Sequence, residues 1–306
     1  MTSLEIKSTI NRDKVAQFIP EKIARTAINK LTSYMNLART VTRVFEQEVG
    51  QEGDTVKVPV YGNLSANEMS KTGVVDVQDP QATDVELTVD QHWESSFLIR
   101  DVARAMANQD VLAGYVENGA IALAEKIENS LASLYLSAGD NISAGANIGL
   151  DDIRSLRKKH VDLKIPRLAP KYLYLDTDGY SDLLALSTFT DASAFGSRSA
   201  LIEGKIPTLY GYGIFETQNV VSTGSPATYH CLGYTEQAMA LVMRPLPGVD
   251  AGLGAKSVVV QDAESGVGMR VSYSWDKDHL GVQVTLDVLF GVGTLRDDFL
   301  IDVQHT

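Results

Sequence analysis

The sequence of 306 residues contains only one cysteine, Cys231, and no long apolar run. One cysteine cannot form an internal disulfide, and its isolation fits a reducing cytosol better than a disulfide-stabilised secreted domain. No stretch approaches the roughly 18 consecutive apolar residues that a membrane-spanning helix needs. The first residues, MTSLEIKSTINRDK, lack the apolar segment of a secretory signal. We therefore expect a protein outside membranes and outside the secretory pathway.

Positive charge is the next scarcity, since 27 Lys and Arg stand against 39 Asp and Glu and leave a net charge of −12. Residues 1–49 carry eight basic and five acidic side chains, whereas the remainder carries 19 basic and 34 acidic ones. An acidic body repels the phosphates of nucleic acid, so we expect no tight wrapping of DNA, although the chain could enclose DNA without gripping it. Apolar residues make up 44% of the chain, which is enough for a sizeable core.

The clearest pattern is an alternation of apolar and polar residues from Thr83 to Arg100. Its apolar members are Val85, Leu87, Val89, Trp93, Phe97 and Ile99. A period of two predicts one long, half-buried strand, and residues 54–61 (DTVKVPVY) predict its antiparallel partner. A two-stranded ribbon of this length is marginal in water by itself. We therefore expect its apolar face to need a neighbour, for which another copy of the protein is a candidate.

Helical periodicity and turn residues predict the remaining elements. One amphipathic helix opens near Phe18 with Pro20 in its first turn, a long helix runs from 110 to about 137, and a shorter one runs from 151 to about 162. The other expected elements are a strand at 172–175, a helix capped by Thr177 or Asp178, a flexible loop at 187–204, a hairpin of 267–275 with 282–290, and a last strand at 299–303. A long helix against an antiparallel sheet, with a smaller α/β part, predicts an α+β fold.

Neither of two glycine motifs predicts nucleotide binding. In Gly254-Ala-Lys-Ser257, alanine stands where a phosphate-binding loop needs its second glycine, so we expect a surface turn. Gly211-Tyr-Gly213 lacks the third glycine and the strand-to-helix context of a dinucleotide site, so we expect a tight turn there.

The five histidines lie far apart, and none has the i, i+3 or i+4 spacing of a zinc-binding helix. We expect solvated or hydrogen-bonded surface roles for His92 and His279. Cys231 follows His230 directly, but neighbours in a strand point to opposite faces, which is poor geometry for a Cys–His nucleophile pair. We therefore expect Cys231 to be a buried, inert cysteine.

The carboxylates and tryptophans have structural interpretations too. Glu117, Glu125 and Glu128 lie mainly off the apolar stripe of the long helix and predict its solvent-facing side, and Trp93 and Trp275 are expected to be packing anchors. The sequence therefore predicts no catalytic, cofactor-binding or metal-binding residue, and no enzyme.

Taken in order, these elements resemble the major capsid protein of tailed bacteriophages, the Hong Kong 97-type family. That family has an N-terminal arm, an extended β-hairpin loop, a long spine helix, an axial domain and a return to the peripheral sheet. The matching stretches are Phe18-Ile-Pro-Glu21, Gly53-Asp-Thr-Val-Lys-Val-Pro59, Val85 to Ile99 with Asp101-Val102, the helix from Asp110 to Ser137, and Gly204-Lys-Ile-Pro-Thr-Leu-Tyr-Gly211 through Asn219-Val220. The resemblance covers essentially the whole chain, and the order and spacing of the elements carry it.

The resemblance implies an α+β fold of the Hong Kong 97 type in five segments. These are an N-terminal arm (1–49), the extended hairpin loop (50–100), the spine helix and peripheral domain (101–175), the axial domain (176–254) and the return to the peripheral sheet (255–306). No long charged helical segment precedes the arm, so we expect a separate scaffolding protein or none.

The function implied is that of a coat protein, without cofactors or enzymatic activity, which self-assembles into pentamers and hexamers of an icosahedral phage head around double-stranded DNA. The implied partners are other copies of the chain, a portal and decoration proteins, and the shell encloses DNA without specific binding. The implied location is the virion, with assembly in the host cytoplasm. Two alternatives remain open: an encapsulin-like compartment with the same fold and, more remotely, a soluble hydrolase.

Six residues are the candidates for assembly contacts. Leu87, Trp93 and Phe97 lie on the apolar face of the predicted ribbon, and Gly211 and Gly213 are expected to permit the turn by which the axial segment folds back. The sixth is Lys71, near the predicted hairpin tip, because some relatives cross-link a hairpin lysine to an asparagine of a neighbour. An ordinary exposed lysine is the alternative.

Overall fold

The computed structural model describes residues 12–43, 55–61, 64–68, 73, 77, 82–101, 110–165, 169–186, 204, 206, 208–244, 246–249, 255–261 and 267–306. The chain forms two units, each assembled from separate stretches of sequence. Unit 1 takes the described residues up to Arg39 and those of Gln91–Ser130 and Met243–Phe290. Unit 2 takes the described residues of Thr40–Asp90, Leu131–Val242 and Gly291–Thr306.

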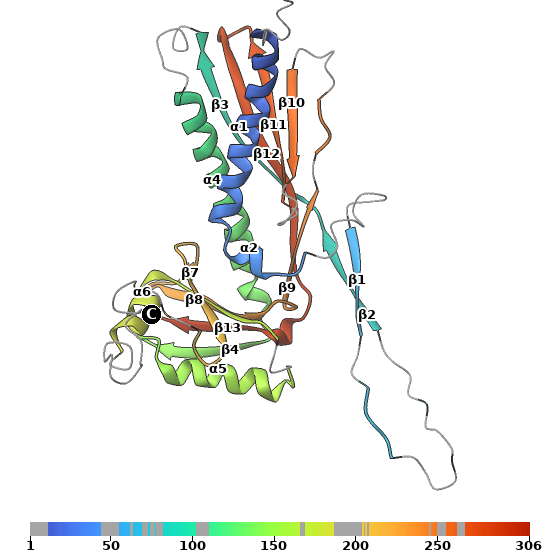
Figure 1. Ribbon diagram of the computed structural model, residues 1–306. Helices are drawn as coiled ribbons and strands as arrows, with labels where there is room; N and C mark the ends of the chain where they lie inside the picture. Colours follow the sequence, from blue (N-terminus) through green and yellow to red (C-terminus); the bar gives the residue numbers. More distant parts are fainter. Residues whose placement is uncertain are drawn as a thin grey trace, which may run out of the picture. The chain divides into compact units, whose positions relative to one another are not determined.

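Unit 1 consists of two long helices against one face of an antiparallel sheet (Figure 1). The helices are α1 (Arg12–Tyr34) and α4 (Asp110–Ala132), and the short α2 (Leu37–Thr40) follows α1. The strands are β3 (Gln91–Arg100), β10 (Ala255–Gln261), β11 (Gly268–Asp276) and β12 (Gly281–Thr294), in the order β10-β11-β12-β3. Neighbours in this order are antiparallel throughout.

Side-chain alternation in β12 explains which face the helices cover. Val284 and Leu286 are fully buried, and Gly119 of α4 lies so close that a Cβ there would be 3.3 Å from the Leu286 side chain. On the opposite face, Thr285 and Ser96 share a hydrogen bond of 2.7 Å. The alternation predicted for the last hairpin is therefore confirmed, with its apolar side facing the long helix.

The predicted single strand from Thr83 to Arg100 is wrong, because the structure has two strands there. β2 (Ala82–Thr88) and β3 are separated by Val89 and Asp90. The break coincides with a change of partner: β3 pairs with β12 and β2 pairs with β1 (Thr55–Tyr61). A strand that exchanges one neighbour for another cannot keep one continuous ladder, although its side chains go on alternating.

The β1–β2 hairpin belongs to unit 2, and its predicted antiparallel pairing is confirmed. Val56 faces Leu87 across the two strands, and both are buried. Leu87 lies against Gly293 of β12, where a Cβ would lie 2.3 Å from a Leu87 methyl carbon. At Gly291 the approach is closer still, since a Cβ would lie 2.1 Å from the carbonyl oxygen of Thr88. The root of the hairpin is thus held against the end of β12. At Gly291 the backbone of Thr88 leaves room only for glycine, whereas at Gly293 the contact is with the end of the Leu87 side chain.

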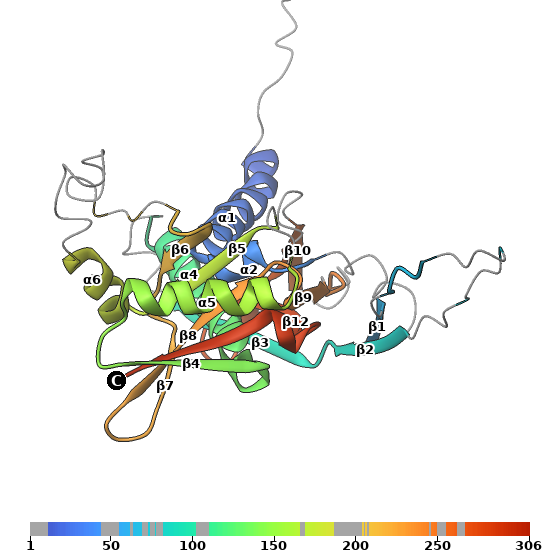
Figure 2. The ribbon, with the colours of Figure 1, turned by 90° about the horizontal axis from the view of Figure 1, so that it is seen from below.

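The rest of unit 2 is a six-stranded mixed sheet (Figure 2). Its strands are β4 (Asp140–Gly145), β13 (Leu300–His305), β8 (Thr228–Thr235), β5 (Lys171–Leu175) and β6 (Tyr212–Glu216) in that order, with β7 (Val221–Thr223) also paired to β8. Helix α5 (Leu150–Asp162) packs on β8, because Leu156 lies against Gly233. The other elements are α6 (Thr177–Ala185), β9 (Met239–Arg244), which pairs with β12, and two 3₁₀ turns at Ser133–Ser137 and Asp297–Phe299.

Most predicted helices and strands are found near their predicted bounds, with three corrections. The helix expected to be capped by Thr177 or Asp178 is capped by Asp176 instead. Helix α1 begins at Arg12 rather than near Phe18, so Pro20 lies inside the helix and not in its first turn. The turn expected at Gly254–Ser257 is wrong for Ala255 onward, since β10 begins there and forms an edge of the unit 1 sheet. The loop expected at 187–204 lies almost entirely outside the described residues. No helix in the described part of the chain is long and apolar enough to cross a membrane.

Candidate assembly surfaces

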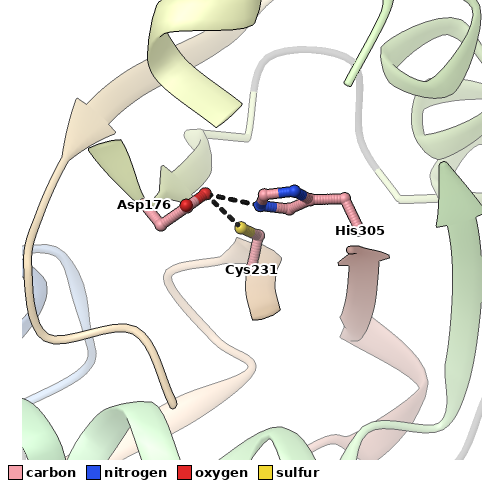
Figure 3. A group of neighbouring side chains, drawn as sticks. All are labelled: Asp176, Cys231 and His305. Carbon is pink, nitrogen blue, oxygen red and sulfur yellow. Dashed lines mark hydrogen bonds and ion pairs between the residues drawn. The ribbon is translucent and has the colours of Figure 1, made fainter. Parts of the chain in front are cut away.

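Three buried side chains of metal-binding types meet in unit 2 (Figure 3). Asp176 follows β5 and caps α6, Cys231 comes from β8, and His305 ends β13. One carboxylate oxygen of Asp176 lies 2.7 Å from Nε2 of His305 and 3.5 Å from Sγ of Cys231, and it also accepts the backbone N–H of Gly179. The donor atoms of all three lie within 4.8 Å of one another.

The electrostatics of this cluster describe a hydrogen-bonded core network. Burial raises the pKa of the Cys231 thiol well above its usual value, so the thiol stays protonated and donates to Asp176. The hydrogen bond to Asp176 raises the pKa of His305. Burial is the largest single influence on the pKa of Asp176 and would raise it. The hydrogen bond and charge of His305, with the hydrogen bonds from Gly179 and Cys231, together outweigh burial, and the pKa is lowered. Cys231 and His305 both form hydrogen bonds with Asp176, so the network links α6 to β8 and β13 without needing a metal.

The expectation of a buried, inert Cys231 is confirmed by its position and its raised pKa. The surface roles expected for His92 and His279 are confirmed as well, since both are exposed and hydrogen-bonded, to Asp287 and Asp276 respectively.

His160 is a buried histidine that the sequence did not single out. It lies on the inner side of α5, and its Nδ1 is 2.6 Å from the hydroxyl oxygen of Tyr212. Burial, with a smaller effect from the charge of Lys171, lowers the pKa of His160 to about 4. His160 is therefore neutral at pH 7.

This histidine makes the fold acid-sensitive in a predictable direction. In the unfolded chain His160 takes up a proton as the pH falls through its usual 6.5, whereas the folded chain resists protonation down to about 4. Acidification from pH 7 to 4 should therefore remove about 3 kcal/mol from the free energy of unfolding. Replacing His160 with Gln should lower the free energy of unfolding at pH 7. It should also abolish the loss of about 3 kcal/mol between pH 7 and pH 4, as measured by urea unfolding at both pH values. An unchanged acid sensitivity in the variant would contradict the assignment.

The expectation that Glu128 faces solvent is wrong. The helical pattern placed it on the solvent-facing side of α4, but it is 1% exposed. Its two carboxylate oxygens accept the backbone N–H groups of Leu37 and Ala38, each at 3.0 Å. A carboxylate is well suited to the unsatisfied N–H groups at a helix start. Glu128 thus fastens the chain after α1 to the long helix inside unit 1.

The candidate assembly residues lie in different environments. Leu87 is 2% exposed and packs within its own chain, whereas Trp93 is 42% exposed in strand β3. One face of the Trp93 ring is covered by the Nζ atom of Lys126, 4.0 Å from the ring centroid. The half-buried Phe97 lies 5.7 Å from the ring of Tyr115, which is itself exposed. Trp93 and Phe97 with Tyr115 therefore form an aromatic strip along β3 and α4.

The remaining candidates concern backbone turns and the hairpin tip. Gly211 has φ +91°, a left-handed conformation that glycine adopts without strain, in a turn closed by hydrogen bonds between Leu209 and Tyr212. Gly213 lies in strand β6 instead, so its predicted part in the turn is wrong. Lys71 lies outside the described residues.

Sequence reasoning also missed several exposed apolar side chains. Trp275, expected to be a packing anchor, is 55% exposed. Tyr61, Leu64 and Val77 are exposed in the part of the hairpin segment away from its root. Leu64 stands singly between polar residues, whereas Tyr61 and Val77 lie close to valines, and the local pattern does not show whether a partner covers them.

No protein-family model matches the chain, and a search of curated proteins finds no similar sequence. Solved structures do match it over most of their length. A structure from Mycobacterium phage Che8 superposes with a TM-score of 0.67 at 19% identity, covering 88% of this chain and 90% of the other. The capsid structure of cyanophage P-SCSP1u gives 0.61 at 17% identity, with coverage of 88% and 86%.

The chain has the Hong Kong 97-type capsid fold. This confirms the fold class expected from the order of elements. A virus-like particle from Pyrococcus furiosus has a similar chain as well, with a TM-score of 0.51 at 12% identity, covering 92% and 98%. The boundaries predicted for the five segments of the capsid fold stay a prediction.

Proposed function

We propose that this chain is the major capsid protein of an icosahedral phage head, assembling into pentamers and hexamers around double-stranded DNA. The observation that carries the proposal is the similarity to phage structures over nearly the whole of both chains. Such similarity leaves little of the sequence for a separate activity, and the role is mechanical. The chain would act in the virion after assembly in the host cytoplasm, with a scaffolding protein, a portal and decoration proteins as further partners.

The physical basis of assembly would be apolar surface that one chain leaves open. The aromatic strip on β3 and α4 and the exposed apolar residues of the hairpin segment are two surfaces of this kind among the described residues. We propose that the hairpin lies over an adjacent subunit and that the N-terminal segment laces across another. Contacts of about 2,000 Å² or more per subunit would place the shell among obligate assemblies.

Electron microscopy of the purified full-length protein tests the proposal directly. We expect closed particles of uniform diameter, and a subunit that stays monomeric at every concentration and salt condition would overturn it.

An encapsulin-like compartment is the second candidate, favoured by the similarity to the virus-like particle from Pyrococcus furiosus. The two functions differ in what the particle holds. Particles from the natural source should contain nuclease-protected double-stranded DNA if the chain is a phage capsid protein. A stoichiometric protein cargo without DNA would favour the compartment.

Removing residues 1–17 is expected to weaken assembly more than it lowers the melting temperature of the subunit. The buried side chains of α1, among them Ala24, Ala27 and Leu31, follow this segment and would stay in place. Sedimentation of particles and thermal unfolding of subunits measure the two effects. As a control, Leu31→Ala opens a cavity in unit 1 and should lower the unfolding free energy by about 2–5 kcal/mol. Equal losses of assembly and stability in the deletion variant would show that the segment is part of the core.

A further inference from the structure

Helix α5 and the residues after it concentrate positive charge in an acidic chain. From Arg154 to Lys171 the sequence has seven Lys and Arg and a single acidic residue, Asp162, while the whole chain carries −12. The apolar side chains of α5, Ile153 and Leu156, are buried in unit 2. The helix therefore turns its basic residues outward.

The outward cations differ in how far the chain itself neutralises them. Arg154 pairs with Asp151, and Lys159 pairs with Asp140 at 2.7 Å. Arg157, Lys158 and Lys164 are exposed, and the described part of the chain provides none of them with an ion pair. We call these three residues the α5 basic strip.

The positive charges are close enough to disfavour one another. Burial lowers the pKa of Lys171, and the charge of Arg157 lowers it further. The charge of Lys171 in turn contributes to the low pKa of His160. Crowded cations are stabilised when an anion binds them.

The shape of the surface favours an extended polyanion over a specific side chain. Two surface hollows among the described residues, of about 260 and 400 Å³, are lined by other residues, and no residue of α5 lines either. Flexible cations on an exposed helix and the turn after it can contact phosphates whatever the base sequence.

We propose that the α5 basic strip binds the phosphate backbone of double-stranded DNA, as the point where an otherwise acidic capsid protein contacts its contents. The inference rests on the proposed function, and it adds a contact to the expectation that the chain encloses DNA without gripping it. Each copy would bind weakly, and the many copies of a closed shell would add their contacts on one DNA molecule. The acidic remainder would keep the DNA from adhering elsewhere.

The test measures binding of a fluorescent DNA duplex to the assembled full-length protein between 50 and 200 mM salt. Three phosphate contacts predict that the association constant of the natural protein falls by about 40-fold over this range. In the double variant Arg157→Glu, Lys158→Glu only one contact remains, so the fall should be about three- to fourfold and binding at 50 mM should be far weaker. Because charge reversal could disturb folding, Arg157→Gln, Lys158→Gln is measured beside it with thermal unfolding.

The matched control is Lys256→Glu, Lys277→Glu, which makes the same change of charge at two exposed lysines of unit 1. It should retain the steep salt dependence of the natural protein. Equal binding by the control and the α5 variants would overturn the inference. Particles that no longer form in the α5 variants, with no DNA binding by the natural protein, would overturn it too and assign the strip to contacts between copies. Failure of the natural protein itself to form particles would instead count against the proposed function.

Discussion

A chain with aspartate in place of Trp93 is expected to fold normally and to form no shells. Trp93 is 42% exposed, and β3 is an edge of its sheet among the described strands, so the single chain gains little from the indole. Exposed tryptophans in assemblies are frequent centres of binding energy, where truncation costs about 2 kcal/mol or more per contact. A charge at the same place adds a desolvation penalty, and a closed shell repeats the loss at every copy.

Sedimentation and electron microscopy measure shell formation, and urea unfolding measures the subunit. Trp93→Phe keeps an apolar ring and serves as the control, with shells expected. Normal shells from Trp93→Asp would exclude the aromatic strip from the lattice. Leu87→Asp, which the sequence places on the same apolar face, should behave differently. Its carboxylate would be buried against Gly293, so it should destabilise the subunit itself.

Glu128→Ala should cost the subunit about 3–5 kcal/mol of unfolding free energy. The substitution removes two hydrogen bonds from a charged acceptor and leaves the buried amides of Leu37 and Ala38 without it. The same helix offers a matched control, because Glu125 is exposed one turn earlier and Glu125→Ala should change stability by no more than about 0.5 kcal/mol.

Urea unfolding gives both stabilities, and limited proteolysis reports the release of the segment around Leu37. Glu128→Gln should lie between the natural protein and Glu128→Ala, because the amide keeps one acceptor oxygen. Similar stabilities for the Glu125 and Glu128 alanine variants would mean that the two hydrogen bonds contribute nothing to the fold.

Local periodicity was enough to predict the elements that bury one continuous face. The long helix, the hairpin of β11 and β12, and the pairing of β1 with β2 all follow from side-chain alternation at 3.6 or two residues. The order of these elements then led to the capsid fold. Features that depend on contacts with residues distant in the sequence were not predictable from local periodicity. The step from β2 to β3 leaves the alternation intact, so the sequence reads as one strand through Val89 and Asp90.

The polar contacts were the least predictable part of the sites. Glu128 lies off the apolar stripe of α4, where a solvated glutamate would also lie. It is buried only because the chain around Leu37 packs against that side of α4. Asp176 and His305 are 129 positions apart in the sequence, so no local spacing could join them. Trp93 and Trp275 were misjudged for the opposite reason, because alternation tells which face a side chain takes and not whether that face is covered.

The glycines under the hairpin root have a mechanical consequence. Gly291 lies against the carbonyl group of Thr88, and Gly293 lies against the side chain of Leu87. The close backbone contact at Gly291 leaves the base of the hairpin no room to slide along β12. A force applied to the far end of the hairpin is therefore transmitted through its fixed base into the last strands of the chain. Gly291→Ala would push the Thr88 backbone away from β12, and a shell built from such subunits should rupture at a lower internal pressure.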